Sequence, residues 1–173
     1  MERKGVQYGV ALELVCNRPK DYIDRFAEEA ADEMLPPGGD IVLLTEKLGG
    51  RIHYRNIFED DADVDTIFVH RMNDFDIVLP DHSTPRRDRF TIAHELGHFF
   101  LHSWMGQRPL KAARSGSNRA EWEANWFAAG LLCPKTKFKA AHGKKRSLSW
   151  LADKFDVSEH VAKIRCVVLG LSI

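Results

Sequence analysis

The sequence from residue 89 to residue 102 is Arg89-Phe-Thr-Ile-Ala-His94-Glu95-Leu-Gly-His98-Phe-Phe-Leu-His102, and it contains the pattern H-E-x-x-H. Residues four apart in an α-helix lie one turn apart on the same face, so the imidazoles of His94 and His98 can reach one cation. Glu95 lies about 100° further round the helix, where its carboxylate can take a proton from a metal-bound water. The pattern therefore predicts a helix that carries two metal ligands and a general base.

The flanking residues favour this helix. Pro80 is expected to end a strand, and Thr84-Pro85 supplies an N-cap followed by proline at the first helical position. We therefore expect a helix from Pro85 to about Trp104.

A third metal ligand is expected on the next helix, predicted for residues 118–132 and ended by Pro134. A catalytic zinc site uses three protein ligands and one open position. Glu121 is our candidate for the third ligand, and Asn125, one turn further on, can hydrogen-bond a ligand imidazole without binding the metal itself. Glu123 points about 200° away from Glu121 on a helix and is the weaker candidate.

Other roles for these residues stay open. His94 and His98 can be ordinary polar residues of an amphipathic helix. Glu121 can instead close a capping box with Asn118, and its carboxylate cannot fill both roles at once. His102 continues the four-residue spacing, but four residues of a straight helix rise about 6 Å, so we expect His102 to contact a ligand or to support the helix rather than to bind the metal.

Two further features of the site are less defined. The chemistry needs a group that stabilises an oxyanion, for which Tyr54, His70 and His102 are candidates. Aromatic residues follow both helices and are expected to form core packing between them, with Gly97 permitting a close approach: Phe90, Phe99, Phe100, Trp104, Trp122, Trp126 and Phe127.

The other elements predict an α+β protein. Apolar periodicity predicts helices over residues 19–35 and 40–47, the second capped by Asp40, and over 136–142 and 148 to the end, with a break at 156–158. Alternating patterns predict the strands Arg51–Tyr54, Thr66–His70 and Phe75–Leu79, separated by the acidic turn at 59–61 and by Asn73-Asp74. We expect a small, mainly antiparallel sheet packed on the H-E-x-x-H helix. Residues 106–117 are expected to form a polar loop.

Composition limits the classes of function. With 173 residues, 44% hydrophobic and 29% charged, the chain is expected to fold as one globular domain. Its 25 basic and 25 acidic residues cancel, so no overall field favours nucleic acid or membranes, and the basic run at 135–146 is interpreted as a solvated helix face. The three cysteines, Cys16, Cys133 and Cys166, are widely spaced, and no long apolar segment occurs, so we expect a cytoplasmic protein without a signal peptide or membrane helix.

The motifs resemble the ImmA/IrrE family of zincin-like metallopeptidases. The resemblance rests on the stretch from Arg89 to His98, on Glu121-Trp-Glu-Ala-Asn125 with Phe127-Ala-Ala, and on Leu131-Leu-Cys-Pro134. It covers roughly residues 19 to 134. Cys133 stands where the family more often has methionine, a change that leaves the catalytic residues unaffected.

The resemblance implies that His94, His98 and Glu121 bind the metal and that Glu95 is the general base. It also implies limited proteolysis of a helix-turn-helix repressor of a mobile element or stress response, commonly encoded nearby. Zn²⁺ is the expected ion, although these ligands also accept Mn²⁺ or Fe²⁺. We expect the substrate to extend along a sheet edge formed by Phe75–Leu79.

The tail leaves alternatives open. We expect a metallopeptidase core over residues 1–134 and a helix-turn-helix-like extension over 135–173 that packs on it, with Val161, Ile164 and Val168 facing inward. DNA binding by this tail is possible but not favoured, because its second helix offers few base-reading groups. A second alternative is a catalytically silent metal-binding regulator or antitoxin-like protein that binds its partner or DNA.

Overall fold

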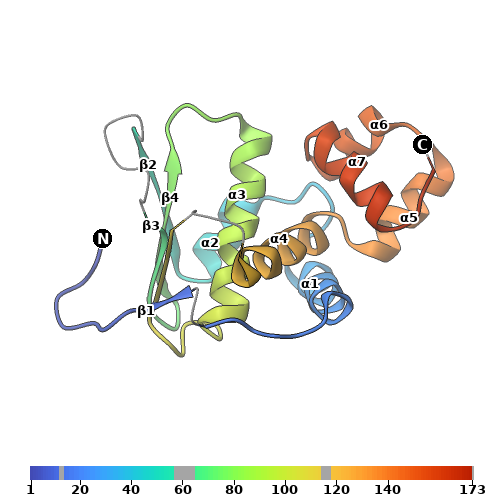
Figure 1. Ribbon diagram of the computed structural model, residues 1–173. Coiled ribbons are helices and arrows are strands. Elements are labelled where there is room, and N and C mark those ends of the chain that lie inside the picture. Colours follow the sequence, from blue (N-terminus) through green and yellow to red (C-terminus); the bar gives the residue numbers. More distant parts are fainter. Residues whose placement is uncertain (12–13, 57–64, 114–117, 173) are drawn as a thin grey trace.

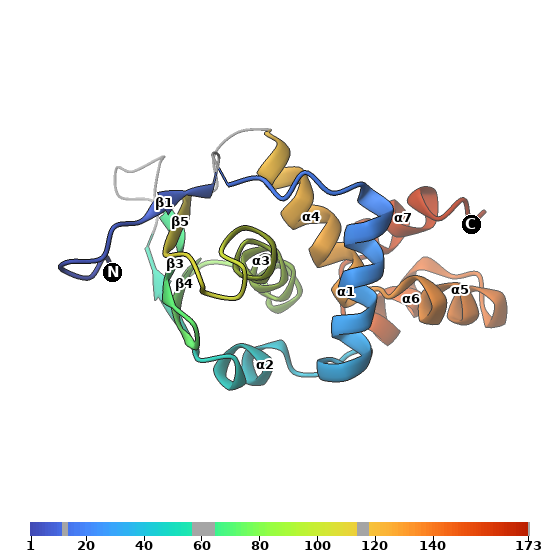
Figure 2. The same ribbon diagram turned by 90° about the horizontal axis from the view of Figure 1, so that it is seen from below.

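The computed structural model describes residues 1–11, 14–56, 65–113 and 118–172. Its described strands form one sheet in the order β1-β5-β3-β4-β2, and the helices lie on one face of that sheet (Figure 1). Helix α3 lies against the sheet, and helices α1 and α4 lie on the far side of α3 (Figure 2). The architecture is the α+β class that the sequence predicts.

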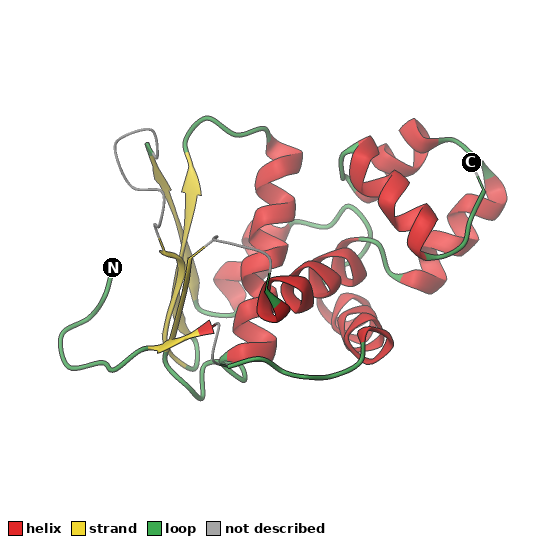
Figure 3. Ribbon diagram, viewed as in Figure 1, coloured by secondary structure: helices red, strands yellow, loops and turns green. Residues whose placement is uncertain are grey.

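The strands are β1 (Gly9–Val10), β2 (Gly50–Arg55), β3 (Asp65–Arg71), β4 (Asp74–Pro80) and β5 (Leu110–Ala113). The helices are α1 (Lys20–Met34), α2 (Ile41–Lys47), α3 (Pro85–Gly97), α4 (Arg119–Leu132), α5 (Lys135–Lys144), α6 (Leu148–Phe155) and α7 (Glu159–Val168). Helix α3 continues directly into a π-helical turn, η2 (His98–His102). Strands and helices occupy separate layers (Figure 3).

Most predicted elements are present within one or two residues of their expected ends. The Asp40 carboxylate caps α2 by accepting hydrogen bonds from the backbone N–H groups of Val42 and Leu43, at 2.9 and 3.1 Å. The H-E-x-x-H helix begins at Pro85 as expected, although the side chain of Thr84 makes no capping hydrogen bond. The predicted acidic turn at 59–61 lies outside the described residues.

The sheet is mixed rather than mainly antiparallel, which corrects the prediction. Strand β3 pairs antiparallel with β4 and with β5, whereas β2 pairs parallel with β4 and β1 pairs parallel with β5. An alternating sequence predicts that a segment is a strand, but it does not identify the neighbours of that strand. The predicted antiparallel direction is therefore wrong for two of the four strand pairs, β2 with β4 and β1 with β5.

The expected edge strand lies in the interior of the sheet. Strand β4, which contains Phe75–Leu79, is hydrogen-bonded on both sides, to β3 and to β2, and the described sheet ends at β2 and β1. Its residues are buried almost throughout, as is typical of a central strand. The proposed substrate path along Phe75–Leu79 is therefore wrong. The expected polar loop at 106–117 contains strand β5, and the short strand β1 was not predicted.

Helix α3 is enclosed on nearly every side. All its residues from Arg89 to Gly97 are buried except Phe90, because the helix lies between the sheet and α4. On the sheet side, the rings of Phe99 and Phe75 stack with centroids 4.4 Å apart. A helix buried all round is held by packing on several faces, which fixes the position of every side chain it carries.

The outer face of the sheet, opposite α3, is covered by an ion-pair network. The Asp76 carboxylate accepts hydrogen bonds from Arg51 Nε at 2.7 Å, His70 Nε2 at 2.7 Å and His53 Nε2 at 2.8 Å. His70 in turn contacts the hydroxyl of Tyr8 at 2.5 Å, which attaches the N-terminal segment to the sheet. Burial raises the pKa of Asp76, but these hydrogen bonds outweigh it and hold the pKa well below its usual range.

Helices α5, α6 and α7 gather beyond α1 and α4, on the side away from the sheet (Figure 1). The buried Arg165 of α7 anchors them, because it bonds the Cys133 carbonyl at 2.9 Å and pairs with Asp24 of α1 at 2.7 Å. The inward positions of α7 are Ala162, Arg165 and Cys166. Val161, Ile164 and Val168 face α3 and α4 across a cavity, which corrects the prediction that they pack inward, since Ile164 and Val168 are exposed and Val161 is half-buried. In the part of the chain described here, no helix has the length and apolar character to cross a membrane.

Gly97 permits the close approach of α3 and α4. A Cβ atom at this position would lie 2.9 Å from the Cα and 3.1 Å from the carbonyl oxygen of Ala124, both backbone atoms that cannot rotate away. Alanine normally stabilises a helix by about 1 kcal/mol relative to glycine, but here the overlap outweighs that gain.

We therefore expect Gly97→Ala to lower the free energy of unfolding by about 1–3 kcal/mol. Gly143→Ala in α5 is the matched control, because a Cβ there has open space, and it should leave stability unchanged or raise it. Urea denaturation measures both variants. Equal effects of the two substitutions would contradict a tight contact at Gly97.

The Asp76 network predicts a pH-dependent contribution to stability. Because the pKa of Asp76 is lower in the folded than in the unfolded chain, its stabilisation is fully present above the unfolded pKa of about 3.9 and is lost as the pH falls below it. Asp76→Asn should lower the free energy of unfolding at pH 7 by roughly 1–3 kcal/mol. The difference in free energy of unfolding between wild type and Asp76→Asn should narrow between about pH 4 and pH 2. A difference that is constant with pH would contradict the lowered pKa of Asp76.

Candidate metal centre

Helix α3 places two imidazoles side by side in the interior. His94 and His98 are both buried, and their Nε2 atoms lie 3.2 Å apart, one helical turn from each other. This is the arrangement that the four-residue spacing predicts. The neighbours Ala93 and Leu96, fully buried on the other faces of the helix, hold it in this rotation.

Helix α4 brings Glu121 to the same point. One carboxylate oxygen lies 3.2 Å from His94 Nε2, and the other lies 3.2 Å from His98 Nε2. The backbone N–H of Glu121 donates to the Asn118 side chain at 3.1 Å, so Asn118 caps α4. The Glu121 side chain itself turns to the histidines, which disagrees with the alternative in which it completes a capping box.

These three donor atoms fit a metal ion. Within the described ranges, His94, His98 and Glu121 are the one group of three or more His, Cys, Asp or Glu side chains with donor atoms within 4.8 Å of one another. The two Nε2 atoms lie 3.2 Å apart, and each lies 3.2 Å from a different oxygen of the Glu121 carboxylate. These separations suit a metal ion, because metal–ligand bonds of about 2.0 Å in a tetrahedral site place neighbouring ligands about 3.3 Å apart. The set of two imidazoles and one carboxylate suits Zn²⁺ and also Mn²⁺ or Fe²⁺.

The electrostatics favour the protonation states that metal ligands need. Burial lowers the pKa of His98 to about 4, so this imidazole is neutral near pH 7. Burial raises the pKa of Glu121, but the hydrogen bonds with His94 and His98 outweigh it and lower the pKa to about 2. A neutral imidazole and an ionised carboxylate are the forms that bind cations.

The far nitrogen of each imidazole also has a partner. Nδ1 of His94 lies 3.1 Å from the amide oxygen of Asn125, as the spacing along α4 predicts. Nδ1 of His98 lies 2.9 Å from Nδ1 of His102, whose Nε2 lies 3.1 Å from the Glu123 carboxylate. His102 thus lies behind His98 rather than among the three donor atoms.

Sequence reasoning missed the part played by Glu123. Its side chain is fully buried and accepts hydrogen bonds from Arg119 and from the backbone N–H groups of Cys16 and Asn17, all at 2.8 Å. Burial raises its pKa, but contacts with His102 and Arg119 lower the pKa to about 2. The N-terminal partners are far away in sequence, and no local pattern identifies them.

Glu95 and the three candidates for the oxyanion-stabilising group, Tyr54, His70 and His102, lie in different parts of the structure. Glu95 is fully buried on α3, between the two histidines in sequence. His70 lies on the outer face of the sheet, where it binds Tyr8 and Asp76, so it cannot act at this site. His102 is engaged by His98 and Glu123. Tyr54 is exposed on the edge strand β2 and lines a cavity of about 450 Å³ next to the start of α3.

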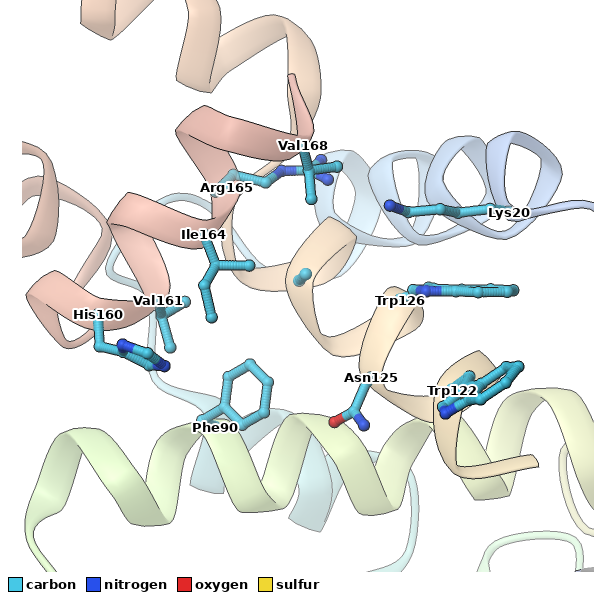
Figure 4. A pocket seen from close by; sticks show the side chains of 11 residues that line it. Lys20, Phe90, Trp122, Asn125, Trp126, His160, Val161, Ile164, Arg165 and Val168 are labelled. Carbon is cyan, nitrogen blue, oxygen red and sulfur yellow. The ribbon is translucent and has the colours of Figure 1, made fainter. Parts of the chain in front are cut away.

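The aromatic residues only partly form the predicted core. Phe100 and Phe127 are buried and stack with centroids 5.2 Å apart, which joins η2 to α4. Trp104 and Trp122, by contrast, are about half exposed. Phe90, Trp122 and Trp126 line a cavity of about 530 Å³ between α3, α4 and α7, with Asn125 in its wall (Figure 4). These side chains therefore border an open apolar pocket beside the cluster of His94, His98 and Glu121.

The fold and the site together define an α+β protein with a buried His-His-Glu cluster held by two helices. Residues 45–167 match the family model Peptidase_M78, described as the IrrE N-terminal-like domain, and the chain belongs to this family. This confirms the resemblance to ImmA/IrrE proteins.

One solved structure extends the comparison of the fold. A Mycobacterium tuberculosis transcriptional regulator is similar over 85% of this chain, with 19% sequence identity and a TM-score of 0.55. The match covers 47% of that protein, so the chain spans about half of its length. At this identity the likeness concerns the fold alone. No curated protein matches the chain at a significant level.

The geometry predicts that Glu121 is required for metal affinity. Glu121→Ala removes one of three donors and leaves two imidazoles facing each other, so we expect zinc affinity to fall by more than the roughly 10- to 100-fold that the loss of a ligand's hydrogen-bond partner costs. Glu33→Ala, at an exposed site on α1, is the matched control and should bind zinc like wild type. Competition with a chromophoric chelator measures both. Unchanged affinity in Glu121→Ala would exclude this side chain as a ligand.

Proposed function

We propose that this chain is a metal-dependent endopeptidase in which His94, His98 and Glu121 hold the metal and Glu95 is the general base. The observation that supports it is a cluster buried by two helices, in which the Nε2 atoms of His94 and His98 lie 3.2 Å apart and each lies 3.2 Å from one carboxylate oxygen of Glu121. Membership of a peptidase family agrees with this proposal. Zinc is the ion we propose, and manganese or iron would fit the same ligands.

The residues around the site suggest how the reaction proceeds. A bound metal ion supplies Lewis acidity towards a peptide carbonyl and towards water. Glu95, buried next to His94 in sequence, accepts the proton that water releases and returns it to the leaving amine. Asn125 holds His94 by its Nδ1 atom, so that the Nε2 atom faces the metal position.

We propose that the substrate is a regulatory protein, specifically a helix-turn-helix repressor of a mobile element or stress response. Two facts support a regulatory context: the family model and the similarity in fold to a protein named as a transcriptional regulator. We further propose that residues 135–173 are a helical extension packed on a core formed by 1–134. The burial of Arg165 against Cys133 and Asp24 supports this arrangement.

Glu95→Gln tests the proposed reaction. The amide keeps the size of the side chain but cannot take up a proton, so cleavage of the repressor encoded nearby should fall between about a hundredfold and ten-thousandfold, while zinc binding is retained. Mass spectrometry of the repressor after incubation with the zinc-loaded protein measures cleavage, with Glu33→Gln as the matched control.

Two results would overturn parts of this proposal. Cleavage by Glu95→Gln at the wild-type rate would exclude Glu95 as the base. A stable complex with the repressor, uncleaved and insensitive to chelator, would instead support a catalytically silent binding protein.

A further inference from the structure

The contacts behind His98 form a continuous chain of buried polar groups. His98 Nδ1 lies 2.9 Å from His102 Nδ1, and His102 Nε2 lies 3.1 Å from Glu123 Oε2. His102 and Glu123 are both fully buried. The π-helical turn, in which the Ser103 N–H donates to the His98 carbonyl at 3.1 Å, contains both histidines. Turns of this kind are rare and are found frequently at functional sites.

Only one assignment of protons satisfies every contact in this chain when His98 binds a metal. A neutral imidazole carries one proton, and a metal ligand needs a free lone pair on the ligating nitrogen. If His98 Nε2 faces the metal, its proton lies on Nδ1 and is donated to His102 Nδ1. His102 must then carry its own proton on Nε2, which it donates to Glu123.

If position 123 carried no hydrogen-bond acceptor, nothing would keep the proton of His102 on Nε2. His102 can then carry its proton on Nδ1, so His98 must accept through Nδ1 and carry its proton on Nε2. That proton points at the donor atoms of His94 and Glu121, which lie 3.2 Å away, and it blocks the lone pair that the metal requires.

Glu123 is itself fixed in place. Arg119 and the backbone N–H of Asn17 donate to Oε1, and the backbone N–H of Cys16 donates to Oε2, each at 2.8 Å, so both oxygens are held by donors other than His102. Surrounded by these N–H donors, the carboxylate stays ionised and can only accept a hydrogen bond from His102.

We propose that Glu123 is a positioning residue of the metal centre, which acts through His102 to keep the Nε2 lone pair of His98 directed at the metal. This inference rests on the proposed metal site, because it concerns how one of the proposed ligands is oriented. Carboxylate partners of ligand imidazoles raise ligand basicity and fix the tautomer, and their loss typically weakens metal binding about 10- to 100-fold.

A double-mutant cycle on zinc affinity tests the proposal. Glu123→Met and His102→Phe keep the approximate volume of each side chain and remove its polar atoms, and each should weaken zinc binding about 10- to 100-fold. Because Glu123 acts on His98 only through His102, the second substitution should have no further effect. The double variant should therefore bind zinc as tightly as the single variant with the lower zinc affinity. Glu33→Met, at an exposed site on α1, is the matched control, because it removes a carboxylate that lies outside this chain of contacts. It should bind zinc like wild type.

The outcomes separate this inference from the proposed function. If wild type does not bind zinc, the proposed metal site fails. If wild type binds zinc but the two single effects multiply in the double variant, or Glu123→Met binds like wild type, the positioning role is wrong.

A second measurement needs no variant and remains informative if Glu123→Met fails to fold. Long-range ¹⁵N NMR of the zinc-loaded wild-type protein reports the tautomer of each histidine. The proposal expects the proton of His98 on Nδ1 and that of His102 on Nε2. A proton on Nδ1 of His102 in the zinc-loaded protein would overturn it.

Discussion

Helices α3 and α4 approach so closely at Gly97 that a Cβ atom there would lie 2.9 Å from the Cα of Ala124. This contact lies three residues after His94 on one helix and three residues after Glu121 on the other. It therefore sets the distance at which the carboxylate meets the imidazoles. The sheet supports the arrangement from the other side, because Phe75 of β4 stacks on Phe99 just after His98. The packing of apolar and small residues thus fixes the positions of His94 and His98 relative to Glu121, which lie on two separate helices.

Burial of so many polar groups requires that each has a partner. An ionised carboxylate in the interior is costly unless it is paired and hydrogen-bonded. Glu121 meets two imidazoles, and Glu123 meets an imidazole, a guanidinium group and two backbone N–H groups. Helix α4 provides both glutamates and Asn125. It therefore supplies Glu121 to the cluster, and it also holds His94 through Asn125 and His102 through Glu123. The ligand geometry and the surrounding hydrogen bonds consequently form one cooperative unit.

Local patterns in the sequence predicted the parts of this protein that depend on local periodicity. The four-residue spacing of His94 and His98, and that of Glu121 and Asn125, placed these residues correctly because a helix has a fixed period. Long-range pairings could not be read in this way. Strand β4 proved central because β2 and β3 pair with its two sides, and β5 was assigned to a loop because its four residues carry a weak pattern. Glu123 was overlooked because its partners are Cys16, Asn17 and His102, which only the folded chain brings together.

X-ray absorption at the zinc K-edge of the zinc-loaded protein identifies the atoms bonded to the metal and so tests the proposed ligands. We expect four light ligands at about 2.0 Å, including the scattering of two imidazole rings. A sulfur shell at about 2.3 Å, or a shell of oxygens without imidazole, would show that His94, His98 and Glu121 do not form the metal centre.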